Sequence, residues 1–93
     1  MSGKFDNIPV EEDTRILLSL PMKFGPFDIV YQMWSWEGIT AESIIFMSED
    51  VAEMSDDELE QMVKNRPTTI DDSGVTLSRG KEYTFVNFNF VTD

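Results

Sequence analysis

The sequence contains no cysteine and no histidine among its 93 residues. Without cysteine, the chain has neither a disulfide framework nor a thiolate metal site. Without histidine, the commonest general base is missing as well, so neither a Ser-His-Asp nor a Cys-His catalytic arrangement can be built. We therefore expect a protein that is not an enzyme and that carries no cofactor and no metal ion.

Basic residues are scarce. The chain has seven Lys and Arg and 18 Asp and Glu, which give a formal net charge of −11. Nucleic acids and anionic membrane surfaces are polyanions, so direct binding to either is disfavoured. The charge favours a basic protein partner, in particular a nucleic-acid-binding protein or a nuclease. The acidity could also confer only solubility, or reflect a high-salt habitat, because net charge bears on solubility and association rather than on fold.

Long apolar runs are missing too. No segment approaches the roughly 18 apolar residues that cross a bilayer, and residues 1–6 lack the apolar core of a signal peptide. We therefore expect a cytoplasmic protein, located in the host cytoplasm if its source is viral.

Glycines are few and scattered, at positions 3, 25, 38, 74 and 80. A phosphate-binding loop needs glycines at fixed spacing followed by a lysine, and the chain has no such run. The EF-hand loop needs a glycine at its sixth position, which neither residues 49–60 nor residues 71–82 provide. The plentiful carboxylates therefore do not predict a specific calcium site.

The composition that remains is that of a folded domain. Hydrophobic residues make up 41% and aromatic residues 12% of the chain, which is ordinary for globular proteins. A chain of this length builds one core. We expect a single domain over residues 14–93, preceded by a flexible or loosely docked arm over residues 1–13.

Aromatic and β-branched residues make residues 27–36 the strongest strand candidate. Residues 14–20 also favour a strand; the alternative is a short helix, which Pro21 would end. Two prolines and a glycine predict a connection over residues 21–26. Residues 43–47 predict a short strand followed by a new helix start at Ser48. One continuous helix over residues 41–54, capped by Thr40, is the alternative.

Ser55 and Glu58 form a capping box, which predicts a helix over residues 56–65. Lys64 and Arg66 fall at its carboxyl end, and Pro67 stops it. Residues 71–74 predict a turn, and residues 75–78 and 82–91 predict a hairpin.

The aromatic residues of the last strand do not all lie on one face. Tyr83 and Phe85 share one face, whereas Phe88 and Phe90 share the other. Either a β-bulge near residues 86–87 shifts the register, or both faces of the strand are covered.

These elements predict an α+β fold. We expect a small single domain with an antiparallel sheet of about five strands and one main helix packed on one face, in the order β-β-β-α-β-β. Trp34 and Trp36 are expected as core or sheet-face residues. A stacking platform for single-stranded nucleic acid would also need a positively charged groove.

The acidic residues concentrate between positions 49 and 60, where no basic residue occurs. Some of them act as helix-capping and helix-dipole groups. The residues that we predict for partner binding are Glu49, Asp50, Glu53, Asp56, Asp57 and Glu60. Spaced carboxylates can stand in for phosphates and occupy the basic cleft of a partner.

Two functional hypotheses follow. The first is a small acidic inhibitor or regulator, in its most specific form a DNA mimic of the type that phages and mobile genetic elements make against restriction or CRISPR nucleases. The target stays open between a nuclease, an RNA polymerase and a repressor. The alternative is a non-catalytic assembly module whose aromatic strands, residues 27–36 and 83–91, form a homodimer or dock on a larger subunit.

Overall fold

The computed structural model describes residues 5, 8–10, 12–63 and 75–91, of which residues 89–91 are described by their backbone only. The elements in chain order are β1 (Arg15–Phe24), β2 (Phe27–Trp36), β3 (Ile39–Met47), the 3₁₀ turn η1 (Ser48–Asp50), α1 (Asp56–Val63), β4 (Val75–Arg79) and β5 (Tyr83–Val91). The predicted α+β fold, with a five-stranded sheet and one helix, is confirmed.

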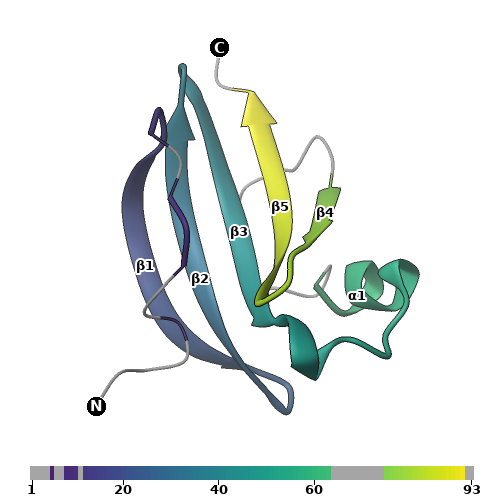
Figure 1. Ribbon diagram of the computed structural model, residues 1–93. Coiled ribbons are helices and arrows are strands. Elements are labelled where there is room, and N and C mark those ends of the chain that lie inside the picture. Colours follow the sequence, from purple (N-terminus) through teal and green to yellow (C-terminus); the bar gives the residue numbers. More distant parts are fainter. Residues whose placement is uncertain (1–4, 6–7, 11, 64–74, 92–93) are drawn as a thin grey trace.

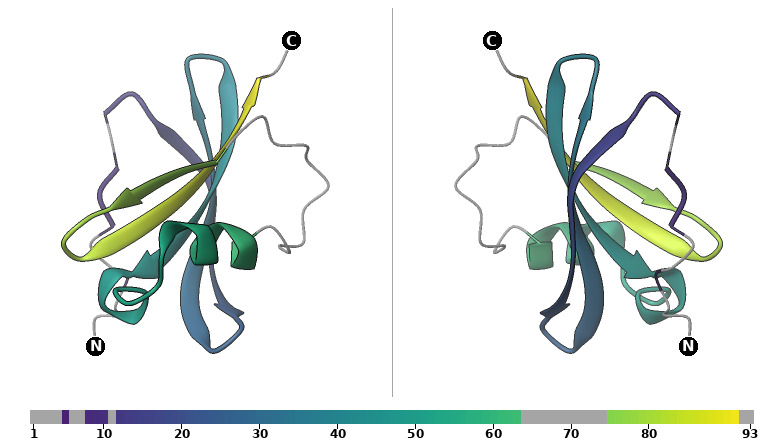
Figure 2. Two further views of the ribbon diagram at one scale, coloured as in Figure 1. Left: turned by 90° about the vertical axis from the view of Figure 1, so that its right-hand side faces the viewer. Right: turned by 90° about the vertical axis from the view of Figure 1, so that its left-hand side faces the viewer.

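The sheet has the strand order β1-β2-β3-β5-β4, and all four pairings are antiparallel. After β3 the chain passes through α1 to β4 at the far edge, and β5 then fills the position between β3 and β4 (Figure 1). The strands fan out in a strongly twisted sheet (Figure 2), as the right-handed twist of individual strands requires.

Each face of the sheet carries its own hydrophobic cluster. On one face Leu59 and Val63 of α1 and Val51 of the preceding loop pack against Ile44 and Phe46 of β3. Because α1 buries its apolar side here, its polar side faces solvent. The predicted packing of one helix on one face of the sheet is confirmed.

The opposite face carries a smaller cluster that the amino-terminal arm covers. Val30, Ile45 and Tyr83 are buried there. Ile8 packs against them, and the ring of Phe5 stacks on Tyr83 with centroids 6.0 Å apart. The described residues of the arm therefore lie on the face away from α1.

Two short turns fix the register of the first three strands. Glu37 and Gly38 both have positive φ, 47° and 81°, which is the conformation of a two-residue type I′ hairpin turn. Gly25 has φ 58° between β1 and β2, a conformation that side-chain-bearing residues rarely adopt. The strand predicted over residues 27–36 is confirmed with the same bounds.

The first strand does not stop at Leu20, and residues 21–24 are not the predicted connection. β1 continues to Phe24, and Pro21 lies opposite Val30. Proline cannot donate to a strand ladder, but β1 is at the edge of the sheet, where one side of the strand has no ladder to serve. The prediction failed because it treated proline as a breaker without knowing the position of the strand in the sheet.

The third strand begins earlier than predicted, at Ile39 rather than at Ser43. The preferred interpretation of a strand over residues 43–47 is right, and the continuous helix over residues 41–54 is wrong. The helix start expected at Ser48 is only the single 3₁₀ turn η1.

The placement of aromatic residues on both faces of the last strand does not involve a bulge. The register of β5 against β3 and β4 runs without a shift. Tyr83 is buried in the arm-side cluster, whereas Val86 and Phe88 are buried in the helix-side cluster. Both faces of β5 are therefore covered, as the second of the two predicted alternatives required.

The capped start of the predicted helix at Asp56 is confirmed. Its expected end at residues 64–65, the basic residues Lys64 and Arg66, and the turn over residues 71–74 lie outside the described residues.

Candidate functional site

The predicted partner-binding residues lie on one continuous stretch, residues 49–60, which we call the acidic segment. It runs from η1 through a short loop into the first turns of α1. Seven carboxylates and no basic side chain occur along it. Between them, Val51 and Leu59 are completely buried in the helix-side cluster. These two apolar anchors turn the intervening acidic side chains towards solvent.

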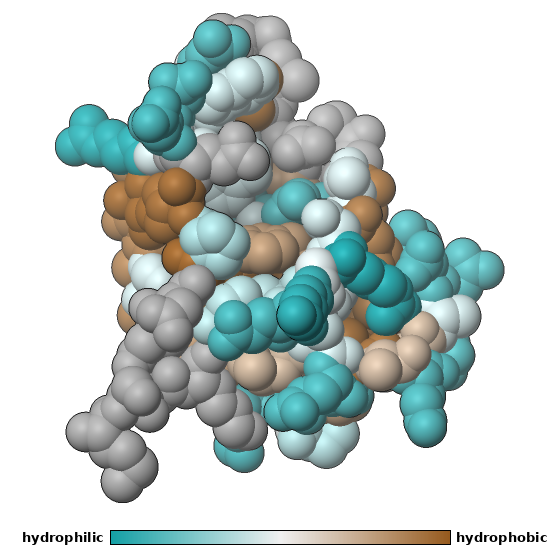
Figure 3. Space-filling model, viewed as in Figure 1, coloured by the Kyte–Doolittle hydropathy of each residue, from teal (hydrophilic) through white to brown (hydrophobic). Residues whose placement is uncertain are grey.

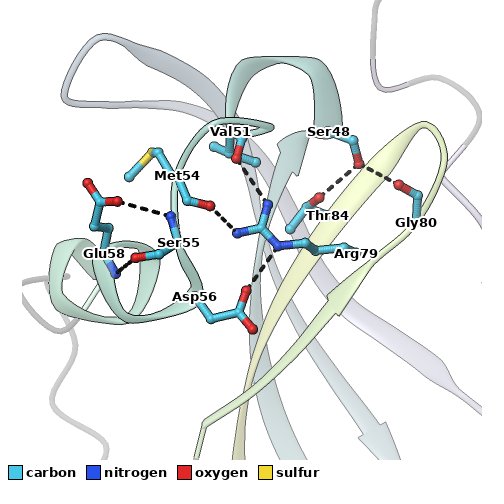
Figure 4. A network of polar contacts seen from close by, with 9 residues as sticks. All are labelled: Ser48, Val51, Met54, Ser55, Asp56, Glu58, Arg79, Gly80 and Thr84. Carbon is cyan, nitrogen blue, oxygen red and sulfur yellow. Dashed lines mark hydrogen bonds and ion pairs between the residues drawn. The ribbon is translucent and has the colours of Figure 1, made fainter.

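A single arginine fixes the acidic segment to the sheet. Arg79, the last residue of β4, donates from Nη1 to the Val51 carbonyl (3.0 Å) and from Nη2 to the Met54 carbonyl (2.6 Å). Its Nε donates to Asp56 Oδ1 at 3.0 Å. Figure 4 shows these three contacts fanning out from one guanidinium. The planar, five-donor geometry of arginine permits such a fork, which lysine cannot reproduce.

Ser48 makes a second attachment at the start of the segment. Its hydroxyl donates to the Gly80 carbonyl and lies 2.8 Å from Thr84 Oγ1 (Figure 4). Its backbone N–H donates to the Glu82 carbonyl at 3.0 Å. The turn between β4 and β5 therefore holds η1 against the sheet.

The predicted capping box is present at the start of α1. The Ser55 hydroxyl accepts from the Glu58 N–H at 3.1 Å, and Glu58 Oε1 accepts from the Ser55 N–H at 3.0 Å. The bond from the Ser55 N–H, followed by that from its hydroxyl, lowers the pKa of the Glu58 carboxyl below its ordinary value. Glu58 is thus a structural carboxylate of the acidic segment.

The structure brings the six predicted residues together but does not give them equal roles. Glu49, Asp50, Glu53, Asp56 and Asp57 are exposed, whereas Glu60 is half-buried. Asp56 is engaged by Arg79. Within the described residues, no ion pair involves the other four exposed carboxylates, Glu49, Asp50, Glu53 and Asp57. These four carboxylates are therefore both exposed and not engaged by a described base.

Glu42 is a buried carboxyl that the sequence did not single out. It lies on β3 with 2% of its surface exposed, and the Tyr31 hydroxyl donates to its Oε2. Tyr31 comes from the neighbouring strand β2 and stands opposite Ile44, two residues along from Glu42. Alternation along residues 39–47 could have indicated that Glu42 shares a face with Ile44 and Phe46.

A groove of about 440 Å³ lies on the face of the sheet away from α1. Trp34, Trp36, Gln32 and Phe85 contribute to its wall, and Pro9 of the arm closes one side. Trp36 is 40% exposed. Figure 3 shows this arm-bearing face, where hydrophobic side chains gather over β1. The sequence predicted that both tryptophans are core or sheet-face residues. It did not predict that they line a groove.

Hydrogen bonds order the floor of this groove. Trp34 Nε1 donates to Ser43 Oγ at 2.7 Å, and Ser43 Oγ donates to Asn87 Oδ1 at 2.5 Å. The chain of bonds crosses β2, β3 and β5, which are adjacent in the sheet. It holds the Trp34 indole in one orientation.

Two features are absent from the described part of the chain. No three acidic side chains come together so as to hold a metal ion. Of the helices in the described part of the chain, none is both long enough and apolar enough to cross a membrane.

Comparison with protein-family models, with curated proteins and with solved structures gives no match to this chain.

Proposed function

We propose that this protein is a small acidic inhibitor or regulator that inserts its acidic segment into the basic, nucleic-acid-binding cleft of a partner protein. One observation carries the proposal. Four exposed carboxylates without an ion pair among the described residues, Glu49, Asp50, Glu53 and Asp57, lie on a segment that Arg79 ties to the sheet at three points. The protein acts by binding and not by catalysis.

The fixed backbone of the segment matters for affinity. A flexible acidic tail would lose conformational freedom on binding, whereas a segment held by Arg79, Val51 and Leu59 has already lost it. The summed negative field also steers a basic partner and raises its association rate by roughly 10 to 10³ fold. A nucleic-acid mimic used by a mobile element against a host nuclease is the most specific form of this function.

Charge reversal tests the proposal. We expect the triple variant Glu49→Lys, Glu53→Lys and Asp57→Lys to lose the partner that the wild-type protein captures from a lysate of its native host. Asp56 is left unchanged because its contact with Arg79 supports the fold. The captured protein is expected to bind nucleic acid, and this protein is expected to displace that nucleic acid from it.

A matched control separates a local site from net charge. The triple variant Glu12→Lys, Asp13→Lys and Glu37→Lys reverses three exposed acids outside the segment. Both triple variants change the formal net charge from −11 to −5. Capture of the partner should survive in the control. Equal loss in both variants would show that only the total charge matters and would contradict a binding segment.

A second candidate function, an assembly module, is favoured by the apolar side chains exposed on β1. Leu18, Leu20 and Met22 are 40%, 44% and 41% exposed. Alternate residues of a strand share one face, so the three form a row at the edge of the helix-side face. The aromatic strands β2 and β5 are interior strands of the sheet, so this row is the more accessible surface for a second copy of the chain.

A further inference from the structure

The described residues that line the groove on the arm side of the sheet include no charged residue, although 27% of the chain is charged. A site for a phosphate, a carboxylate or a cation would present an opposite charge. Its volume of about 440 Å³ and its mixture of aromatic rings with a few polar groups are typical of ligand pockets. The chemistry of the lining therefore suits an uncharged ligand.

Two carboxamides of the groove have unused hydrogen-bonding capacity. Gln32 is only 8% exposed, and its amide makes one bond in the described structure, a long one of 3.5 Å from Nε2 to Ser19 Oγ. Asn87 accepts from Ser43 through Oδ1, and its amide nitrogen donates to no described residue. Gln32 is buried and Asn87 half-buried, and buried polar groups are normally satisfied, so the amide of Gln32, with that of Asn87 beside it, points to a ligand that carries hydrogen-bond acceptors.

The spacing of the two amides matches a left-handed polyproline II helix. Gln32 stands opposite Ser43, which stands opposite Asn87. The backbone positions that carry the two amides are thus two strand intervals apart, or about 9.5 Å across the sheet. One turn of polyproline II contains three residues and rises about 9.3 Å. Carbonyl groups three residues apart therefore have the same spacing as the two strand positions that carry the amides.

The chain already places a proline-containing segment on this face. Ile8 packs against Val30, Ile45 and Tyr83, and Pro9 and Val10 form one wall of the groove. A second segment would lie beside the arm and use the same aromatic surface. Grooves lined by aromatic rings are a recurrent way of recognising proline-rich peptides, because the polyproline II conformation is preformed and costs little entropy to bind.

We propose that this groove binds an uncharged, proline-rich segment of a partner protein in the polyproline II conformation. The prolines pack against Trp36 and Trp34, and two backbone carbonyls of the segment accept hydrogen bonds from Gln32 and Asn87. The site lies on the opposite face from α1 and is independent of the acidic segment.

The two tryptophans of the chain both line the groove, so intrinsic fluorescence reports directly on its occupancy. The probe is a nine-residue polyproline peptide with blocked ends, titrated into the full-length protein. We expect a saturable change in tryptophan emission. A glycine-serine peptide of equal length, which lacks the preformed conformation, is expected to cause none.

Two variants test the contacts, with affinity measured by calorimetry. Trp36→Ala removes an exposed ring and should weaken binding about tenfold or more. Gln32→Met keeps the side-chain volume but removes the amide, and should weaken binding about threefold or more. Circular dichroism confirms that each variant is folded. The triple reversal of Glu49, Glu53 and Asp57 should bind the peptide as the wild type does, which separates this site from the acidic segment.

Three results would overturn the proposal. The first is an emission that stays unchanged up to millimolar peptide. The second is unaltered affinity in both folded variants. The third is saturable binding of a neutral oligosaccharide probe without binding of the polyproline peptide, which would assign the groove to a sugar.

Discussion

At the scale of single residues, Arg79 determines where the acidic segment lies. Its guanidinium donates to two backbone carbonyls and one carboxylate, from residues 23 to 28 positions away in the chain. A hydrogen bond that involves a charged group contributes about 1.5–3 kcal/mol, and an unsatisfied carbonyl costs a similar amount. The position of the segment therefore depends on a residue outside it.

We expect Arg79→Lys to lower the free energy of unfolding by about 2 kcal/mol, because a lysine ammonium cannot reach three acceptors in this fork geometry. Urea denaturation measures the change. Lys81→Ala, which removes an exposed base from the adjacent turn, is the control and should stay within about 0.5 kcal/mol of the wild type. An Arg79→Lys variant as stable as the wild type would show that the fork does not hold the segment.

Glu58 makes the stability of α1 depend on pH. Hydrogen bonds from Ser55 lower the pKa of its carboxyl in the folded state. The stabilisation is therefore complete above the ordinary glutamate pKa of about 4.3, and it is lost as the pH falls through the lower folded-state value. We expect Glu58→Gln to have a lower Tm than the wild type at neutral pH, and the difference to vanish in acid.

Thermal unfolding of both proteins across this range measures the effect. Glu53→Gln, which makes no hydrogen bond in the described structure, controls for the loss of one negative charge. A difference in Tm between Glu58→Gln and the wild type that persists in strong acid would mean that ionisation of Glu58 is not its cause.

Local residue contacts could be predicted from the sequence, and distant ones could not. The capping box joins Ser55 to Glu58, three positions apart, so its pattern is visible in the chain itself. The contacts of Arg79 and the burial of Glu42 depend on which strands become neighbours. The six predicted site residues were found by density of charge alone, so the engagement of Asp56 by Arg79 was missed.

At the scale of elements, β1 combines an exposed apolar row with features that protect a sheet edge. Pro21 has no N–H to offer to an added strand, Lys23 places a charge beside Asp28, and the register shifts between Ile16 and Leu18. These features discourage the addition of another strand by backbone pairing. A second copy would therefore contact the side chains of β1 rather than extend the sheet.

Sedimentation velocity tests the assembly candidate. If β1 forms a dimer contact, the wild-type protein should sediment as a dimer at tens of micromolar, and Leu20→Lys should be monomeric because a charge cannot be buried unpaired in an apolar contact. Thr76→Lys on the opposite edge strand β4 is the control. A wild-type monomer at all concentrations would exclude self-assembly through this surface.

Element type was easier to predict than element extent. β2 has the predicted bounds because its aromatic and β-branched residues are bracketed by turns with glycine at Gly25 and Gly38. β1 and β3 were predicted too short. In both cases pairing with β2 extends the strand over residues of weaker propensity, and such tertiary stabilisation is not visible in a local window.

At the scale of the whole molecule, the two faces of the sheet carry different chemistry. The helix side presents the acidic segment, and the arm side presents a groove whose described lining is aromatic and uncharged. An acidic surface meets basic partners through long-range steering, whereas an aromatic groove acts only at contact. Because the two proposed sites lie on opposite faces, we expect each to bind its partner whether or not the other is occupied.

Binding through the acidic segment is best tested by the salt dependence of affinity for the captured partner. Exposed charge pairs are screened as the Debye length falls from about 14 Å at 0.05 M to about 6 Å at 0.3 M salt. We predict that the dissociation constant of the wild-type protein rises steeply over this range, and that the triple reversal of Glu49, Glu53 and Asp57 shows no measurable binding at the lower salt. An affinity that is flat across the range, or unchanged by the reversal, would contradict binding through the acidic segment.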